Sequence, residues 1–331
     1  MTLAHGSGGK ATRALVESLF LEELGNPLLE PLGDSALLEL NGSRVAFTTD
    51  SYVVKPIVFP GGDIGELAVN GTVNDLAVSG AKPVALSAGF LVEEGFEIAE
   101  LRRLAASMAR AAKAAGVAVA TGDTKVVERG KADGLYVNTA GIGLVPTGLE
   151  LGGEHVRPGD RVLLSGTLGD HGMAVMIARG ELALEVELES DTAPVHELAA
   201  SLLELGDAVR WLRDPTRGGL ATALNELAED ARLAVALEEA ALPLRPEVVG
   251  ACEILGIDPL YVANEGRFVA FVAASDAERA LACLARDPRS VSARGIGTVH
   301  RSPAGVVTMR SLIGATRIVD MLSGEQLPRI C

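Results

Sequence analysis

The spacing of apolar residues changes along the chain, and each spacing predicts a different kind of secondary structure. The clearest helix is predicted for Glu97–Ala115, where Ile98, Leu101 and Leu104 recur at helical spacing and Gly116 can serve as a left-handed cap residue. The same periodicity predicts further helices over Thr12–Leu24, Gly65–Ser79, His171–Arg179, Pro194–Leu205, Gly219–Ala231, Glu247–Leu255 and Ala277–Ala285.

Short apolar runs bounded by turn residues predict strands. Asn41-Gly42 is typical of a two-residue hairpin turn and joins the runs Ala36–Leu40 and Val45–Thr49. Two buried strands are predicted over Val117–Ala120 and Asn138–Leu144. The remaining predicted strands are Ala85–Leu91, Arg161–Ser165, Phe268–Ala273, Gly295–Val299 and Val306–Arg310. Because strands and helices mix in both halves, the predicted fold class is α/β or α+β.

A stretch rich in Gly and Pro, from Pro146 to Gly159, separates two groups of predicted elements and indicates a domain boundary. A chain of 331 residues is long enough for two domains. We therefore expect an N-terminal domain over residues 1–147, a C-terminal α/β domain over residues 148–310, and a flexible tail over residues 311–331 that carries Cys331.

The amino-acid composition argues against some classes of binding partner. A net charge of −15 and an aromatic content of 3% argue against a nucleic acid, since an acidic surface repels phosphates and few aromatic side chains are available for stacking. The three cysteines form no CxxC pair, which favours a reducing compartment. No secretory signal and no apolar run near the ~20 residues of a membrane helix is evident. A cytoplasmic protein without a membrane partner is therefore expected.

Several carboxylates stand beside glycines, near strand ends or in an apolar helix. Asn70 and Asn74 lie four residues apart on that helix, so they share one of its faces and bring polar groups into an apolar environment. The four carboxylates of interest are Asp34, Asp50, Asp75 and Asp123. If the fold brings them together, their oxygens suit Mg²⁺ bound to nucleotide phosphates. The alternative is that each is a separate cap or turn residue.

Two segments rich in glycine could bind phosphate. Asp214–Gly219 comes directly before a predicted helix, whose first N–H groups and Arg217 would form an anion site, unless the segment is a plain helix-start turn. The leader His5–Lys10 is not a Walker loop, because Ala11 stands where Ser or Thr is required. It could still fold over phosphates through its N–H groups and Lys10, or be a disordered terminus.

Two further residues are candidates for chemistry. Glu265, in Asn264-Glu265-Gly266, comes just before a predicted strand, where a glutamate can be catalytic or merely exposed. Cys331 lies beside a main-chain carboxylate, which raises rather than lowers the pKa of its thiol. Such a thiol suits a carrier that receives a group from an activated donor, although it could also be an ordinary terminal residue.

Taken in order, these motifs resemble one known family. The motifs are His5–Lys10, Thr49–Ser51, Asn70–Ala77, Thr121–Lys125, Asp214–Gly219, Asn264–Gly266 and the ending Pro328-Arg329-Ile330-Cys331. Together they resemble the HypE family of hydrogenase maturation proteins over the whole chain. The ending distinguishes that family from related aminoimidazole ribotide synthetases, selenophosphate synthetases and thiamine-monophosphate kinases. The resemblance implies a two-domain PurM-like fold, with an N-terminal domain that forms a homodimer and ATP bound near the dimer interface.

The resemblance also implies a reaction and partners. A carbamoyltransferase, HypF, would place a carbamoyl group on the Cys331 thiol, and the chain would use ATP to dehydrate it to a thiocyanate. The cyano group would then pass to iron on a HypC–HypD complex and become a ligand of [NiFe]-hydrogenase.

We assign the site residues as hypotheses. Mg²⁺ would be held by Asp34, Asp50, Asp75 and Asp123, and catalysis would involve Cys331, Glu265 and Lys125. The nucleotide would contact Gly8, Gly9, Lys10, Asp50, Asn70, Thr124, Arg217, Gly218 and Gly219. Lys125 can act as a base only if burial or cationic neighbours keep it neutral, so an exposed Lys125 paired to an acid would exclude it.

Two alternatives stay open. One is another ATP-dependent synthetase or kinase of the same superfamily, which would not need Cys331. The other is a thiol carrier without catalytic activity. The carboxylates argue against this alternative, because a scaffold needs no metal–nucleotide site.

Overall fold

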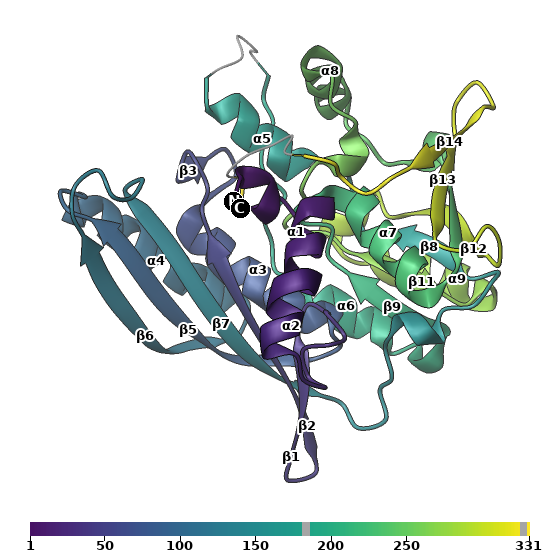
Figure 1. Cartoon of the computed structure of the whole chain (residues 1–331), viewed down its shortest axis with the longest axis horizontal. Helices are drawn as coiled ribbons and strands as arrows, with labels where there is room; N and C mark the ends of the chain where they lie inside the picture. The colour runs from purple at the N-terminus through teal and green to yellow at the C-terminus, as the bar shows by residue number, and fades with distance from the viewer. Residues whose placement is uncertain (181–185, 325–329) are drawn as a thin grey trace.

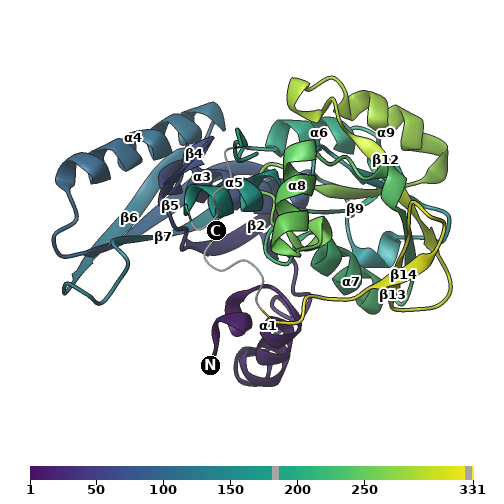
Figure 2. The ribbon, with the colours of Figure 1, turned by 90° about the horizontal axis from the view of Figure 1, so that it is seen from above.

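The computed structural model describes residues 1–180, 186–324 and 330–331 and divides into two lobes, each built on one sheet (Figures 1 and 2). Helices cover the sheets in both lobes, so the predicted mixed α/β architecture is confirmed. Pro328 and Arg329 of the terminal motif lie outside the described residues. Among the residues described, no helix is long and apolar enough to cross a membrane.

The N-terminal lobe holds a five-stranded sheet of order β1-β2-β7-β5-β6, in which only β5 and β6 pair in parallel. The strands are β1 (Ala36–Leu40), β2 (Ser43–Tyr52), β5 (Lys82–Glu93), β6 (Ala118–Val127) and β7 (Leu135–Val145). Asn41 and Gly42 have φ values of 51° and 81°, which is the left-handed backbone that the predicted hairpin turn requires. A small ribbon of β3 (Val58–Phe59) and β4 (Gly62–Asp63) leads into the first long helix.

Helices α3 (Ile64–Val78) and α4 (Ile98–Ala114) pack on one face of this sheet (Figure 1). The Asp63 carboxylate caps α3 by accepting from the N–H groups of Gly65 and Glu66. Among the described residues nothing covers the opposite face, and Phe47, Ile142 and Leu144 on it are each at least 43% exposed. We call this surface, with Leu91, the outer face.

The C-terminal lobe holds a seven-stranded sheet of order β14-β13-β10-β12-β8-β11-β9 that is covered on both faces. Its strands are β8 (Arg161–Leu164), β9 (Val209–Arg213), β10 (Ala234–Glu238), β11 (Val269–Val272), β12 (Arg294–His300), β13 (Val306–Arg310) and β14 (Thr316–Val319). Helix α7 (Gly219–Ala231) packs on one face, and α6 (His196–Leu203) and α9 (Ala277–Leu284) pack on the other. Alternate residues of β8 and β11 therefore face two separate apolar clusters.

The remaining helices lie between or beside the sheets. Helices α5 (Asp170–Ala178) and α8 (Pro246–Leu255) contribute to the core shared by the two lobes. The predicted first helix begins two residues early, as α1 (Lys10–Leu15), and continues through a π-helical turn into α2 (Leu21–Leu24). The leader before it is docked, because the Lys10 N–H donates to the Leu322 carbonyl over 2.9 Å.

Three differences from the sequence-based prediction matter for the site. Strand β6 runs to Val127 and is exposed, whereas a short buried strand was expected, because it lies at the edge of a sheet whose outer face is uncovered. Strands β9 and β10 were not predicted. The tail expected from residue 311 to be flexible contains β14, which pairs antiparallel with β13, so its start belongs to the sheet.

Candidate active site

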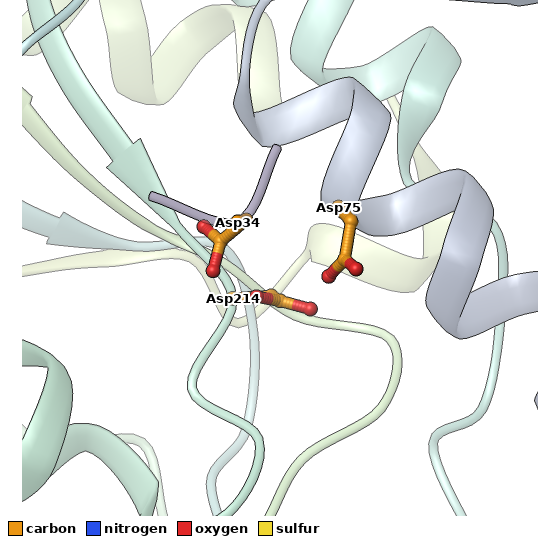
Figure 3. Close-up of side chains that lie close together, drawn as sticks. All are labelled: Asp34, Asp75 and Asp214. Atoms are coloured by element: carbon orange, nitrogen blue, oxygen red, sulfur yellow. The ribbon is translucent and has the colours of Figure 1, made fainter. Parts of the chain in front are cut away.

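Three aspartates from distant parts of the sequence converge where the two lobes meet (Figure 3). Asp34 lies in the loop before β1, Asp75 on α3, and Asp214 directly after β9. One carboxylate oxygen of each lies within 4.8 Å of the others. We call these three residues and the cavity beside them the acid pocket.

Burial raises the pKa of all three carboxyl groups. The pKa of Asp34 rises to about 6, because its burial outweighs the nearby Arg213 guanidinium. The pKa values of Asp75 and Asp214 rise well above the usual range, first through burial and then through repulsion from neighbouring carboxylates. Arg213 offsets part of this repulsion, since its Nε lies 3.0 Å from Asp34. A cluster of oxygen donors with too little compensating charge fits a hard divalent cation such as Mg²⁺.

A cavity of about 260 Å³ opens beside these carboxylates. Asp50 on β2 and Arg217 line it, with Arg217 Nη2 3.8 Å from the Asp50 carboxylate. Helix α7 begins at the cavity with Gly218 and Gly219, whose φ values of 77° and 62° favour glycine. Its first N–H groups and Arg217 therefore lie together at the cavity, in the arrangement that suits a bound anion.

The leader closes one side of the cavity. A Cβ at Gly8 would lie 2.6 Å from the Arg217 carbonyl oxygen, so only glycine permits this approach. Gly9 packs as closely against Leu322. Lys10 points elsewhere, because its Nζ forms an exposed ion pair with Asp320 at 2.5 Å. The structure thus brings Gly8 to the predicted nucleotide site, while the Lys10 side chain is held outside it.

Cys331 is packed into the shared core beside the acid pocket. Its main-chain oxygen accepts from the Val53 N–H over 3.0 Å, and the Ile330 carbonyl oxygen lies 2.5 Å from His171 Nε2. We call Ile330 and Cys331, with these two partners, the thiol seat. Burial raises the pKa of the Cys331 thiol, and Arg217 opposes this rise. The pKa of Arg217 is raised chiefly by its interaction with the same thiol.

Glu265 interacts electrostatically with both the thiol seat and the acid pocket. Its pKa is raised well above the usual range by burial, then by Asp214 and Asp50, and Arg217 opposes the rise. Its backbone is fixed, since its N–H donates to Asp191 and its carbonyl accepts from Asn74 over 2.9 Å. Within the described part of the chain its Oε1 is buried and has no hydrogen-bond partner. An unsatisfied buried carboxyl oxygen is costly unless a ligand completes it.

Helix α3 presents both predicted asparagines to the C-terminal lobe. Asn74 holds the Glu265 carbonyl and accepts from the Val195 N–H over 2.8 Å. Asn70 donates to Thr192 over 3.2 Å, and its Oδ1 lacks a partner among residues 1–180, 186–324 and 330–331. Their shared helical face therefore joins the two lobes.

The structure does not bring Asp123, Thr124 and Lys125 to the acid pocket of the same chain. Across the sheet, Asp50 is opposite Thr139, Thr139 opposite Ala88, and Ala88 opposite Gly122. Residues opposite one another share a face, so Asp123 and Lys125 lie on the outer face and Asp50 on the inner one. By the same alternation Thr124 belongs to the inner face of the sheet, but it is exposed on β6.

Two assignments change as a result. Asp123 is not a metal ligand within one chain, since one register step separates it from the face of Asp50. Lys125 is 69% exposed and its Nζ lies 2.8 Å from Asp123, which is the arrangement that excludes a buried neutral base in a single chain. Asp214, which sequence reasoning had taken only as a helix start, joins Asp34 and Asp75 in the carboxylate cluster.

Comparisons with known proteins identify the family. Residues 32–145 match the N-terminal domain and residues 157–310 the C-terminal domain of AIR synthase related proteins. The chain is 55% identical to the carbamoyl dehydratase HypE of Rhodobacter capsulatus, over 100% of this chain and 98% of that protein. It is 46% identical to the Escherichia coli HypE, over 99% and 98%.

Comparison with solved structures leads to the same family. A HypE in a HypE–HypF complex superposes with a TM-score of 0.89 at 46% identity, covering 93% of this chain and 100% of that one. A HypE in complex with ATP superposes with a TM-score of 0.84 at 46% identity, covering 99% of both chains. The predicted family and PurM-like fold are thus confirmed, and the chain belongs to the HypE family of carbamoyl dehydratases, the hydrogenase maturation enzymes with two AIR synthase related domains.

Proposed function

We propose that this protein uses ATP to dehydrate a carbamoyl group carried on its own Cys331 thiol, yielding the thiocyanate. The observation that carries the proposal is the position of Cys331, which packs partly buried against the shared core and interacts electrostatically with Arg217 and Glu265. Both residues also interact with carboxylates that line the acid pocket. A partly buried thiol with a raised pKa is a poor nucleophile and suits a carrier whose group arrives already activated.

The acid pocket would hold Mg²⁺ through Asp34, Asp75 and Asp214, with Asp50 beside them. When bound, Mg²⁺ neutralises charge on the phosphates of ATP. Binding of ATP is supported by the crystal structure of a 46% identical HypE in complex with ATP. Arg217 and the first N–H groups of α7 face the same cavity and would hold the transferred phosphoryl group.

The chemistry follows from the poor leaving ability of an amide oxygen. The carbamoyl oxygen attacks the γ-phosphorus, ADP leaves, and an O-phosphorylated intermediate forms with the loss of one N–H proton. Cleavage of the C–O bond then releases phosphate as the second N–H proton departs, which leaves S–C≡N. Glu265 is our candidate for the proton acceptor, because its unpartnered buried Oε1 can accept from the carbamoyl N–H once it is ionised.

We infer a homodimer formed through the outer face of the N-terminal sheet. Phe47 and Ile142 lie opposite one another there and are both 43% exposed, which is unusual for paired apolar side chains on a sheet. Pairing of two such faces would also cover β6, so that Asp123 and Lys125 could serve the site of the other subunit.

The dimer is tested by charge insertion. We expect Ile142→Lys to give monomers in light scattering, whereas Ile318→Lys, on the exposed β14, leaves the dimer intact. If residues act across subunits, mixing inactive Lys125→Ala with inactive Cys331→Ser restores activity in the mixed dimers. If activity is not restored, Lys125 does not act at the site of the other subunit.

HypF is the partner we propose as the carbamoyl donor, supported by the crystal structure of a 46% identical HypE in a HypE–HypF complex. Delivery of the cyano group to a HypC–HypD complex stays a prediction, as does a cytoplasmic location.

The deciding experiment follows the intact mass of the protein with HypF, carbamoyl phosphate and Mg-ATP. We expect addition of a carbamoyl group and then loss of one water mass, with neither in Cys331→Ser. The variant Asp214→Asn should take up the carbamoyl group and keep it. If the wild type also keeps it, the chain is a carrier only. If no adduct forms while HypF modifies a control protein, Cys331 is not the acceptor.

A further inference from the structure

His171 is a fully buried histidine on α5 that contacts the main chain next to Cys331. Its Nε2 lies 2.5 Å from the Ile330 carbonyl oxygen, and its Nδ1 lies 2.8 Å from Ser190 Oγ. A carbonyl oxygen can only accept, so Nε2 carries the proton and Nδ1 accepts from the serine hydroxyl. Burial lowers the pKa of His171, which favours this neutral form.

The imidazole is held from several sides. Ser190 Oγ also accepts from the Thr192 N–H over 3.1 Å, and the Ser190 N–H donates to the Pro60 carbonyl over 2.8 Å. Phe59 meets the ring edge-on, with centroids 5.4 Å apart. A ring fixed at both nitrogens and on its flank is a rigid donor aimed at one acceptor.

The two polar anchors of the thiol seat flank Cys331 on its main chain. His171 holds the carbonyl just before Cys331, and the Val53 N–H holds the oxygen of Cys331 itself. The Ile330 side chain adds a third anchor, since it is only 5% exposed within the shared core. Neither hydrogen bond involves the sulfur.

We propose that His171 is a positioning residue that seats Cys331 through the Ile330 peptide, and that it holds the thiol, carbamoyl and cyano forms alike. The second part rests on the proposed function. Because the contact is to main chain, it does not change when the sulfur is modified. Discrimination between the forms is then left to groups that interact electrostatically with the thiol, Arg217 and Glu265 among them.

The test is the rate at which iodoacetamide alkylates Cys331 in the full-length protein, followed by peptide mass. In His171→Leu, which keeps bulk but lacks the donor, we expect alkylation about tenfold faster, the effect of losing one hydrogen bond of about 1.4 kcal/mol. Buried Cys252 is the internal control and should stay unreactive. An unchanged Cys331 rate with Cys252 still protected overturns the proposal.

If His171→Leu also exposes Cys252, the variant has lost its fold and Ser190→Ala decides. This variant removes only the group that orients Nδ1, so we expect a smaller acceleration, about threefold, with Ser275→Ala on the surface as the control. No acceleration overturns the role of His171. Neither assay needs ATP or HypF, so failed dehydration with accelerated alkylation would reject the proposed function and keep the seat.

Independence from the state of the sulfur is tested by hydrogen exchange at the Val53 amide. We expect equal protection when Cys331 is a free thiol and when it has been cyanylated chemically, and faster exchange in His171→Leu. Loss of protection on cyanylation of the wild type would overturn this part of the proposal.

Discussion

The acid pocket and the thiol seat are neighbours, and both keep ionisable groups away from water, but they do so with opposite consequences. In the acid pocket, burial and mutual repulsion raise the pKa of three carboxyl groups, and Arg213 compensates only in part. In the thiol seat, burial raises the pKa of one thiol and keeps it neutral.

The two regions differ in whether their charged groups need a ligand for compensation. Three clustered carboxylates are stabilised by a proton or a cation, so the acid pocket is complete only with a ligand. A neutral thiol needs no counter-ion, and its main chain is already held by His171 and Val53. On the proposed function, the acid pocket would bind a cation, and the thiol seat would keep Cys331 in place.

The largest expected effect comes from the residue that links the two regions. Glu265→Gln should retain ATP binding and lose dehydration by about 10²–10⁴-fold, because a positioned proton acceptor is removed. Single-turnover mass measurements on carbamoylated protein check this, with Glu238→Gln, whose side chain is 45% exposed in the C-terminal lobe, as the control. In the wild type the rate should rise with pH as Glu265, whose pKa is raised, ionises. Full activity of the variant would remove Glu265 from catalysis.

The substitution Asp75→Asn should disrupt the acid pocket and leave the thiol seat intact. We expect a loss of about 100-fold or more in ATP-dependent dehydration, since groups that only support metal ligands already contribute 10–100-fold. Alkylation of Cys331 should be unchanged, because the thiol seat does not use Asp75. A variant that exposes Cys331 as well would mean that the two regions are not separate.

The thiol seat alone is broken by Ile330→Ala. Loss of a buried isoleucine side chain costs about 1.5–3 kcal/mol, so the docked population and the single-turnover rate should fall by about tenfold or more. ATP binding should not change. Ile313→Ala, at a position that is 92% exposed, is the matched control. An equal loss in both variants would argue against the seat.

The smallest effect is a pH-dependent shift in melting temperature. A carboxyl group with a raised folded-state pKa contributes stability below its unfolded pKa of about 4 and loses it as pH rises through the folded pKa. For Asp34 that pKa is about 6. Scanning fluorimetry should therefore show Mg²⁺ raising the melting temperature by a few degrees more at pH 8 than at pH 5. An equal shift at both pH values, or the same shift in Asp75→Asn, would contradict a metal site here.

Local patterns predicted much of the fold because they depend on neighbouring residues. The hairpin at Asn41-Gly42 and the bounds of α7 and β13 follow from turn chemistry and periodicity. Strand β9 was missed because its apolar residues form only a short run that Arg210 and Arg213 interrupt. Without β9, Asp214 could not be recognised as a residue at a strand end, where sites form.

The sequence by itself determined the family, the glycines at the start of α7, and the terminal cysteine as the candidate carrier, since each is a motif of adjacent residues. Only the tertiary structure decided which carboxylates meet. Asp123 and Asp50 look alike in sequence, but strand register places them on opposite faces of one sheet. Asp214 reaches Asp34 and Asp75 because the two lobes pack together. Side-chain direction depends on register across several strands and on domain packing, and neither is encoded in local spacing.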